Sequence, residues 1–327
     1  MKTELTIIIV SYNTCDILRQ CLQKLYQNSG DLTFEVIVVD NASKDNSVDM
    51  VRAEFPHVRL VNSQINLGFA AANNVAFRLG RGNYFILLNS DAFIQPNTLQ
   101  QFYDRMEEQK KVGIAGGLLV NTNGSCEPSA RLFPSLLNDF LQMSGLGSKF
   151  PKSRFFGRYD RTWEHPEISC ETDWVPGAFC IIRRSALKNV GYFDERFFLY
   201  FEEVDLCKRM KKRGYSIWYW GDLSITHIGG ESSKTVSHEL FSQAGAQLTL
   251  WRMRSQLLYY RKHKGFIGAW LSKTLEITWN ALRRWKNRRC TDVLSQEKAE
   301  ESNTLIRLMK QAWKETRGGK LSPPKPW

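Results

Sequence analysis

The sequence lacks several patterns that would assign it to a common class of protein. None of its seven cysteines stands in a C-x-x-C pair, and the odd number is spread from Cys15 to Cys290. No run reaches about 18 apolar residues, the length needed to cross a bilayer as a helix. The first residues, Met-Lys-Thr-Glu, lead into an apolar strand without the hydrophobic stretch of a secretory signal. We therefore expect a protein that works in a reducing, cytoplasmic setting.

Two common nucleotide-binding patterns are also missing. No G-x-G-x-x-G follows the first expected strand, and no Gly-rich loop carries the Lys of a Walker A motif. Both motifs place backbone N–H groups against phosphates, so their absence argues against the common dinucleotide-binding and P-loop classes. The sequence contains no recognisable nucleic-acid-binding module either, and we expect no nucleic acid among the partners.

The basic charge of the chain is concentrated in its last quarter. Residues 251–327 hold 18 Lys and Arg against 6 Asp and Glu, and the whole chain of 327 residues holds 45 against 33. Both differences equal +12, so residues 1–250 carry no net charge. An apolar share of 43% fits a folded protein. We therefore expect an α/β domain over residues 1–250 and a basic, amphipathic helical region over residues 251–327.

The basic region shows the pattern of an amphipathic helix. Five apolar residues recur at helical spacing beside Trp270 and Trp285, and a cluster of Arg and Lys follows at residues 283–289. This combination is typical of a helix that lies on an anionic bilayer surface. A helix that packs its apolar face on the protein core would show the same pattern, and both interpretations stay open. The five residues are Ile267, Leu271, Leu275, Trp279 and Leu282.

Strand and helix patterns alternate through the first hundred residues. Apolar runs at residues 5–10, 34–39, 58–61 and 83–88 predict strands, and the amphipathic segments between them predict helices. Fully apolar strands joined by helices indicate a parallel sheet that is covered on both faces. Such sheets bind ligands outside the carboxyl ends of their strands.

Polar residues follow three of these strands. Ser11 and Asn13 follow the first strand, Asp40 ends the second, and residues 89–91 follow the strand at 83–88. A nucleotide would explain the coincidence, because Asp40 can accept the imide N–H of a uracil or thymine. Main-chain groups around Ser11 and Asn13 would then contact the base and ribose. Taken singly, Asp40 could be a turn residue, and Ser11 and Asn13 could be helix caps.

Asn89 and Asp91 offer two oxygen ligands directly after a buried strand. Hard divalent cations such as Mg²⁺ and Mn²⁺ prefer ligands of this kind, and take the rest of their shell from water and phosphates. An Asn-x-Asp after a strand can equally form a turn or a helix N-cap.

Three carboxylates stand within four residues at Glu202, Glu203 and Asp205. Carboxylates this close repel one another, which tends to raise the pKa of at least one of them. A raised pKa suits a general base that works near neutral pH. The alternative is that all three are first-turn helix residues, which the helix dipole favours.

Four segments of the chain together resemble the inverting glycosyltransferase family 2, whose members have the GT-A fold. They are residues 9–13, 38–45, 66–74 and 88–91, and the similarity extends over about residues 5–230. The rhamnosyltransferase-like enzymes of bacterial surface polysaccharide synthesis are the most similar subgroup. The resemblance implies an α/β, Rossmann-like, mostly parallel sheet with helices on both faces. It also implies transfer of a sugar from a dTDP or UDP donor to a hydroxyl of a saccharide or lipid-linked acceptor.

The resemblance also implies roles for particular residues. Asp91, Asn89 and His227 would hold Mn²⁺ or Mg²⁺ against the leaving diphosphate, where the metal acts as a Lewis acid. Glu203 stands at the position of the catalytic base, with Asp205 as the alternate. A lone His at a strand end is usually structural, and Trp174 can equally pack in the core. The acceptor-side residues are Trp174, Gly177 and Glu202, and the nucleotide-side residues are Ser11, Asn13, Asp40, Asn66, Gly68, Asn89 and Ser90.

Two positions depart from the family pattern. Asn89 replaces the first Asp of the usual Asp-x-Asp, and Glu203 replaces an Asp at the base position, which moves that carboxylate by more than about 1 Å. These departures leave open a non-catalytic GT-A scaffold that binds a nucleotide sugar. A nucleotidyltransferase is the other alternative, although residues 11–15 lack its Gly-rich, basic loop. With its basic helix, the chain is expected on the inner face of the cell membrane, as a peripheral protein.

Overall fold

The central element of the protein is a mixed sheet, seen in a computed structural model that describes residues 3–229 and 243–323. Four parallel strands form one half of this sheet, as the apolar runs predict. They lie in the order β3 (Arg59–Asn62), β2 (Phe34–Asp40), β1 (Leu5–Ser11) and β4 (Tyr84–Leu88). The carboxyl ends of these strands therefore meet at one edge, where we expect the ligand site.

The other half of the sheet begins with an antiparallel strand. β9 (Phe179–Arg183) runs antiparallel to β4 on one side and to β6 on the other, and β6 runs parallel to β10. Since β6 and β10 are joined by about a hundred residues, this half could not be ordered from periodicity alone. The remaining strands are β6 (Val112–Val120), β10 (Ser216–His227), β5 (Ala92–Ile94), β7 (Cys126–Glu127) and β8 (Cys170–Glu171).

Both faces of the sheet are buried by helices. Along β1, Ile7 and Ile9 pack into one apolar cluster while Ile8 packs into the other, as the period of two in a strand requires. The first cluster includes residues of α1 (Cys15–Asn28), α2 (Ser47–Glu54) and α4 (Thr98–Glu108). The second includes residues of α3 (Phe69–Leu79), α7 (Arg184–Val190), α8 (Glu202–Lys212) and α10 (Gln243–Asn287).

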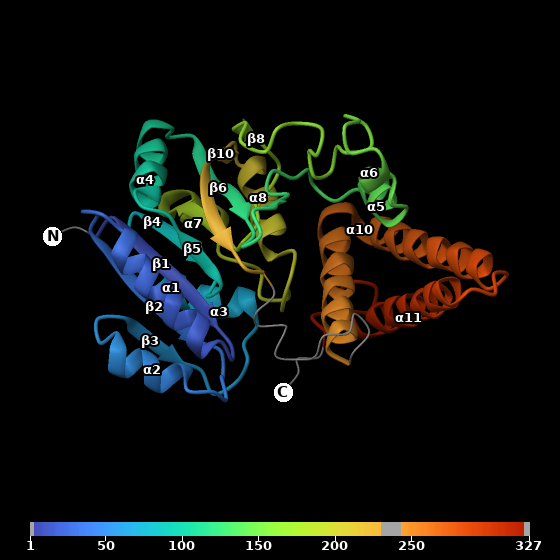
Figure 1. Ribbon diagram of the computed structural model, residues 1–327, viewed down its shortest axis with the longest axis horizontal. Coiled ribbons are helices and arrows are strands. Elements are labelled where there is room, and N and C mark those ends of the chain that lie inside the picture. Colours follow the sequence, from blue (N-terminus) through green and yellow to red (C-terminus); the bar gives the residue numbers. More distant parts are fainter. Residues whose placement is uncertain (1–2, 230–242, 324–327) are drawn as a thin grey trace.

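Two long helices close the described chain. α10 is broken at Gly265, because its φ of 70° and ψ of −169° are not helical. α11 (Val293–Glu315) packs back against α10. Figure 1 shows the part of α10 after the break and α11 as a hairpin that points away from the sheet. Leu257 and Met309 belong to a third apolar cluster, which holds α11 on the first part of α10. The boundary expected between residues 250 and 251 therefore lies inside α10.

The apolar stripe of the second part of α10 faces outward. Ile267 is 69% exposed and Leu282 is 56% exposed. These two side chains therefore do not pack on the core, as the second interpretation of the helix would require. Trp279 is different, because its ring packs edge-on against Phe140 of α5 (Leu136–Met143), with 5.5 Å between centroids. The side of the helix turned toward the protein is polar instead, with Ser272, Glu276 and Asn280 buried. Within residues 3–229 and 243–323, no helix is long and apolar enough to cross a membrane.

Candidate functional site

A chain of hydroxyl groups joins the ends of β1 and β4. Ser11 Oγ lies 2.9 Å from Thr14 Oγ1, and that hydroxyl donates to Ser90 Oγ at 3.2 Å. All three side chains are buried, so Ser11 and Ser90 use their hydroxyls to hold two strand ends together. Thr14, which the sequence did not single out, is the central member. This arrangement leaves the main-chain groups of the loop after β1 to meet a ligand.

Asn13 connects the loops that follow β1 and β2. Its backbone has a positive φ of 53°, and its Oδ1 accepts a hydrogen bond from the N–H of Lys44 at 2.7 Å. Its own N–H donates to Ser43 Oγ at 2.9 Å. The N-cap of α1 is Thr14, so Asn13 is not the helix cap that was its alternative role. The two loops therefore form one rigid rim of the site.

Asp40 is the most informative residue of this rim. It is 1% exposed, and its Oδ2 accepts a hydrogen bond from the N–H of Ser43 at 3.0 Å. Its Oδ1 is buried and has no hydrogen-bond partner among the residues that the structure describes. A buried acceptor without a donor costs about 1–3 kcal/mol, which a ligand N–H would offset. The turn role and the expected imide contact are therefore compatible, because each uses a different oxygen.

A pair of asparagines shapes the loop before α3. Asn41 Nδ2 donates to Asn66 Oδ1 at 2.8 Å, and the N–H of Gly68 donates to the same oxygen at 3.0 Å. Gly68 has a φ of 79°, and a Cβ there would stand 2.4 Å from the carbonyl oxygen of Phe198. The structure thus explains this glycine by its close approach to the segment that leads into α8. Asn41 was not among the expected site residues.

The candidate metal ligands meet where β5 pairs with β10. Ala92 is opposite His227 in this antiparallel pair, which brings Asp91 Oδ1 to 3.5 Å from His227 Nε2. Both side chains are buried. Asn89 lies beside them, with its N–H donating to the carbonyl of Ala178 at 2.9 Å. Gly230, the second glycine after His227, lies outside the described residues.

His227 has a second acidic neighbour. Its Nδ1 lies 3.1 Å from Glu127 Oε2, an arrangement that orients the ring with Nε2 toward Asp91. Burial alone would lower the pKa of His227, but the carboxylates of Asp91 and Glu127 outweigh it and raise the pKa. Glu127 is a hundred residues away in the chain, and no sequence signal marked it.

The residues present fit a divalent cation. His227 Nε2 is buried without a hydrogen-bond partner in the described part of the chain, and it faces a carboxylate, which together make a donor pair that Mn²⁺ accepts. No group of three His, Cys, Asp or Glu side chains gathers as ligands within the described ranges. A cation here would take its remaining ligands from water and the diphosphate of a substrate, as such cations commonly do.

The three clustered carboxylates lie in the first turn of α8, as their alternative reading required. The helix is preceded by Tyr200 and Phe201 with φ of 69° and 71°, and two bulky residues in this conformation mark local strain. Glu202 Oε2 and Glu203 Oε2 are both buried without a hydrogen-bond partner among the described residues. The helix start is therefore held in a costly arrangement of the kind found at functional sites.

Burial raises the pKa values of both glutamates, and their neighbouring charges then act in opposite directions. Burial, followed by the charge of Glu203, raises the pKa of Glu202 well above its ordinary value. Burial also raises the pKa of Glu203, opposed by backbone N–H groups of the helix start and by Arg131. The pKa of Glu202 is therefore raised further than that of Glu203, so Glu202 holds its proton more tightly.

Asp205 is placed quite differently. Its side chain is fully buried and lies within 2.8 Å of Arg209, Lys262 and His263. Burial would raise its pKa, but the hydrogen bond from His263 and the two cations lower it. A carboxylate with a lowered pKa and three cationic or donor neighbours is a poor general base. The structure therefore favours Glu203 over its alternate.

The candidate acceptor residues are enclosed. Trp174 is 6% exposed, its Nε1 donates to the carbonyl of Leu132 at 2.8 Å, and Arg131 lies 5.1 Å above its ring. It fills the packing role that was its alternative, and the structure offers no open ring face for a sugar. Gly177 is buried, and a Cβ there would stand 3.4 Å from the ring of Phe69.

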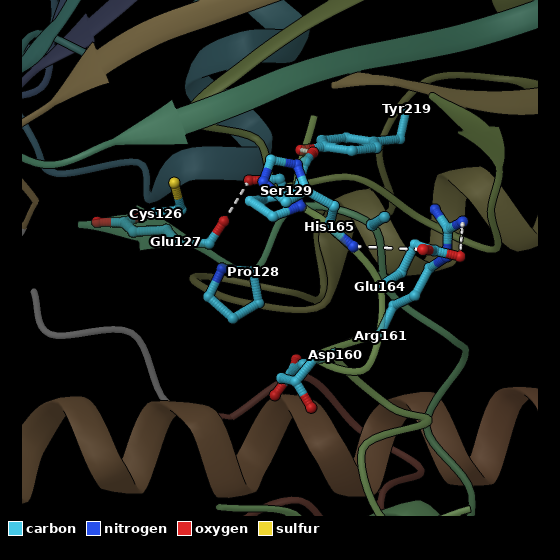
Figure 2. A pocket seen from close by; sticks show the side chains of 12 residues that line it. Cys126, Glu127, Pro128, Ser129, Asp160, Arg161, Glu164, His165 and Tyr219 are labelled. Atoms are coloured by element: carbon cyan, nitrogen blue, oxygen red, sulfur yellow. Dashed lines mark hydrogen bonds and ion pairs between the residues drawn. The ribbon is translucent and has the colours of Figure 1, made fainter. Parts of the chain in front are cut away.

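A pocket of about 210 Å³ has Glu127 and Asp160 in its lining. Figure 2 shows Glu127 on one side of this pocket, Arg161 and Glu164 on the other, and Asp160 below them in this view. Glu127 contacts His227, and Asp160 forms an ion pair at 3.1 Å with Arg131, the cation that acts on Glu203. The pocket therefore adjoins partners of both the cation ligands and the base. Neither Arg131 nor Asp160 was expected from sequence.

The sheet order and the polar strand ends define a GT-A glycosyltransferase. The chain belongs to glycosyl transferase family 2, whose family model matches residues 6–191. It is 29% identical over 244 residues to the N-acetylglucosaminyl-diphospho-decaprenol L-rhamnosyltransferase of Mycobacterium tuberculosis, covering 71% of this chain and 78% of that protein. It is 24% identical over 271 residues to the rhamnosyltransferase WbbL of Escherichia coli, covering 79% and 93%.

Solved structures agree on the fold. The mannosyltransferase PcManGT from Pyrobaculum calidifontis, in complex with GDP-Man and Mn²⁺, superposes with a TM-score of 0.57 at 15% identity, over 95% of this chain and 87% of that one. The predicted GT-A fold with a C-terminal helical extension is confirmed. Family membership and these relatives also confirm an enzyme, which decides against the scaffold and the nucleotidyltransferase.

Proposed function

We propose that the protein is an inverting glycosyltransferase that moves a hexose from a dTDP or UDP donor to a lipid-linked saccharide, with rhamnose as the first candidate. The two relatives described above are rhamnosyltransferases, and the first of them acts on a sugar carried by a lipid diphosphate according to its name. The observation that carries the proposal is the buried pair of Asp91 and His227 at the carboxyl end of the sheet.

The donor is held by groups on the β1, β2 and β4 ends. Asp40 Oδ1 accepts the imide N–H of the base, and main-chain groups near Ser11 and Asn13 contact base and ribose. Asp91 and His227, with Asn89 beside them, hold Mn²⁺ or Mg²⁺ with the diphosphate. When bound, the cation neutralises negative charge on the leaving diphosphate as a Lewis acid.

Glu203 carries out the proton transfer. The acceptor hydroxyl oxygen forms a bond to the anomeric carbon while the bond from that carbon to the diphosphate oxygen breaks on the opposite face. The hydroxyl proton passes to Glu203, and the nucleotide diphosphate leaves with the electron pair. The pKa of Glu202 is raised further than that of Glu203, which supports Glu203 as the carboxylate that takes this proton.

The C-terminal hairpin places the enzyme on anionic lipid. Beyond Gly265 the exposed apolar residues include Ile267, Trp270 and Trp285, and the basic cluster at residues 283–289 follows directly. Arg289 lies 3.7 Å from the centre of the Trp285 ring, which keeps a cation and an interfacial aromatic together. Exposed Trp beside Arg and Lys suits the headgroup level of an anionic bilayer.

A panel of dTDP and UDP sugars tests the reaction. The full-length protein, Mn²⁺ and a short-chain prenyl-diphospho-N-acetylglucosamine should release nucleotide diphosphate and form a disaccharide lipid with at least one donor. Mass spectrometry identifies the product, and the anomeric configuration is read by NMR. Product with a retained anomeric configuration, or no product from any donor, would contradict the proposal.

A further inference from the structure

A second cavity, about 320 Å³ in volume, lies next to the pocket of Figure 2. Ala130 and Arg161 line both cavities, so the two adjoin. Three arginines and a tryptophan, Arg154, Arg158, Arg161 and Trp163, form much of its lining. The rest of its wall comes from Ala130, Leu132, Glu171 and Thr172.

The protein balances the charges of this arginine pocket only in part, because Arg161 pairs with Glu164 at 3.7 Å. Glu171 is the one carboxylate in its lining, and Lys211 already pairs with it at 3.5 Å. Neither Arg154 nor Arg158 has a carboxylate within 4.0 Å among the residues that the structure describes. Arg158 Nε is buried and has no hydrogen-bond partner in the same part of the chain. Arg158 is half-buried and Arg154 is exposed, so the described residues leave two guanidinium groups of this cavity without a carboxylate, and such groups readily bind anions.

The geometry suits a phosphate group in particular. Trp163 has Arg154 at 4.7 Å and Arg161 at 5.4 Å from its ring centre, and these cation–π contacts fix the two guanidinium groups. Guanidinium groups bind phosphate oxygens through paired N–H donors. Several of them around one cavity match the charge of a diphosphate better than that of a single carboxylate.

The neighbouring surface is apolar. Phe155 follows Arg154 and is 53% exposed, and Phe150 is also exposed. Both rings pack on Phe156 with centroid distances of 5.2 Å. An apolar surface beside an anion pocket suits an anion that carries a hydrocarbon chain, and α5 connects this region to the hairpin through Phe140 and Trp279.

The donor diphosphate has its own place at the other end of β10. Glu171 of the arginine pocket pairs with Trp218 near the start of β10, whereas His227 ends that strand. We propose that the arginine pocket binds the diphosphate of the lipid-linked acceptor and so presents the acceptor sugar to the adjoining pocket. This inference rests on the proposed function, because it takes its ligand from the acceptor side of that reaction.

Binding of farnesyl diphosphate to the full-length protein, measured by isothermal titration calorimetry, tests the inference. Arg158→Gln should weaken binding at least about tenfold, which corresponds to about 1.4 kcal/mol. Arg158→Lys keeps the positive charge but not the paired N–H donors of the guanidinium group. Its affinity should lie between those of the wild type and Arg158→Gln. Arg52→Gln, on α2 at the far end of the sheet, is the matched control and should bind as the wild type does. Unchanged binding in Arg158→Gln would overturn the inference.

Further measurements test where the diphosphate binds and whether its lipid chain contributes to binding. Asp91→Ala should leave farnesyl diphosphate binding intact, and its loss in that variant would move the diphosphate to the donor site. Farnesyl diphosphate should bind more tightly than inorganic pyrophosphate, and equal affinities would overturn the assignment to a lipid. If Arg158→Gln does not fold, as seen by circular dichroism, Arg154→Gln carries the same test. No step requires sugar transfer, so a failure of the proposed reaction leaves these results readable.

Discussion

Asp205 of α8 and His263 of α10 are joined by a hydrogen bond of 2.8 Å between two almost fully buried side chains. Lys262 approaches the same carboxylate at 2.8 Å. The helix that carries Glu203 is thereby fixed to the last turn of α10 before the Gly265 break. A group that sequence alone left as a second candidate base acts as the anchor between the catalytic domain and the hairpin.

We predict that Asp205→Asn destabilises the protein. Removing one charge from a buried ion cluster leaves its partners uncompensated and costs about 3–5 kcal/mol of unfolding free energy, which urea titration measures. Asp49→Asn, at a surface pair with Arg52, is the control and should cost less than about 1 kcal/mol. An equally small change in both variants would contradict the anchoring role.

The same carboxylate makes stability depend on acid. Its folded pKa is lowered, so its contribution is fully present above the ordinary aspartate value of about 3.9 and is lost as pH falls through the folded pKa. Between pH 5 and pH 3, the wild type should lose more unfolding free energy than Asp205→Asn does. Parallel stability curves for the two proteins would exclude this linkage.

We predict that Glu203→Gln lowers kcat by at least about 100-fold, the usual scale for a general base. Donor binding should be nearly unchanged. Because burial raises the pKa of Glu203, the acid limb of kcat/KM should lie above the ordinary glutamate value of about 4.3, with activity lost as pH falls through the raised pKa. If Glu203→Gln is active while Asp205→Asn folds correctly but is inactive, Asp205 and not Glu203 is the general base.

For the cation site we predict that Asp91→Ala abolishes both Mn²⁺ binding and transfer. Asn89→Asp should keep activity and tighten Mn²⁺ binding, because a carboxylate replaces an amide as ligand. Electron paramagnetic resonance of free Mn²⁺ gives the affinities without reference to activity. Full activity of the wild type in excess EDTA would show that no cation takes part.

The hairpin should bind anionic vesicles. Each basic residue near the lipid surface contributes roughly 1 kcal/mol, so the protein should co-sediment with phosphatidylglycerol vesicles and be released as salt increases. The double variant Ile267→Ser and Leu282→Ser should lose this binding, and Ile65→Ser, an exposed apolar position outside the hairpin, is the control. Equal sedimentation with neutral and anionic vesicles, or unchanged sedimentation of the double variant, would contradict binding of the hairpin to anionic lipid.

Substitution tests the hairpin better than truncation does. Removing the chain after about residue 265 would also remove α11, whose Leu308 and Met309 cover Leu257 in the third apolar cluster. The truncated protein would therefore expose part of its core, and a loss of transfer would not report on lipid. The two serine variants leave this cluster in place.

The strands in the first half of the fold could be predicted from the sequence because they are buried on both faces. The run predicted at 5–10 is β1 at Leu5–Ser11, and the run predicted at 34–39 is β2 at Phe34–Asp40. Continuous apolar runs and short connections leave little freedom in such units. The polar residues at their ends follow from the same regularity.

The site was less readable wherever it depends on distant contacts. Glu127 reaches His227 across a hundred residues, and Arg131 reaches Asp160 and the Glu203 region. Neither contact leaves a periodic trace in the sequence. For Trp174 the sequence left an acceptor role and core packing both open, and its enclosed side chain fits the packing role. Local pattern identifies which residues are unusual, and packing decides what they touch.

The hairpin also determines how this protein behaves without a membrane. It buries Ser272 and Glu276 against Gln256 and Arg252 of the first part of α10, and it turns Ile267 and Leu282 to solvent. In plain buffer those outward residues are exposed to water, and the same residues on another molecule offer an apolar surface to cover them. Concentrated preparations will therefore self-associate through the hairpin, and a mild detergent that covers this stripe will disperse them without loosening the catalytic domain.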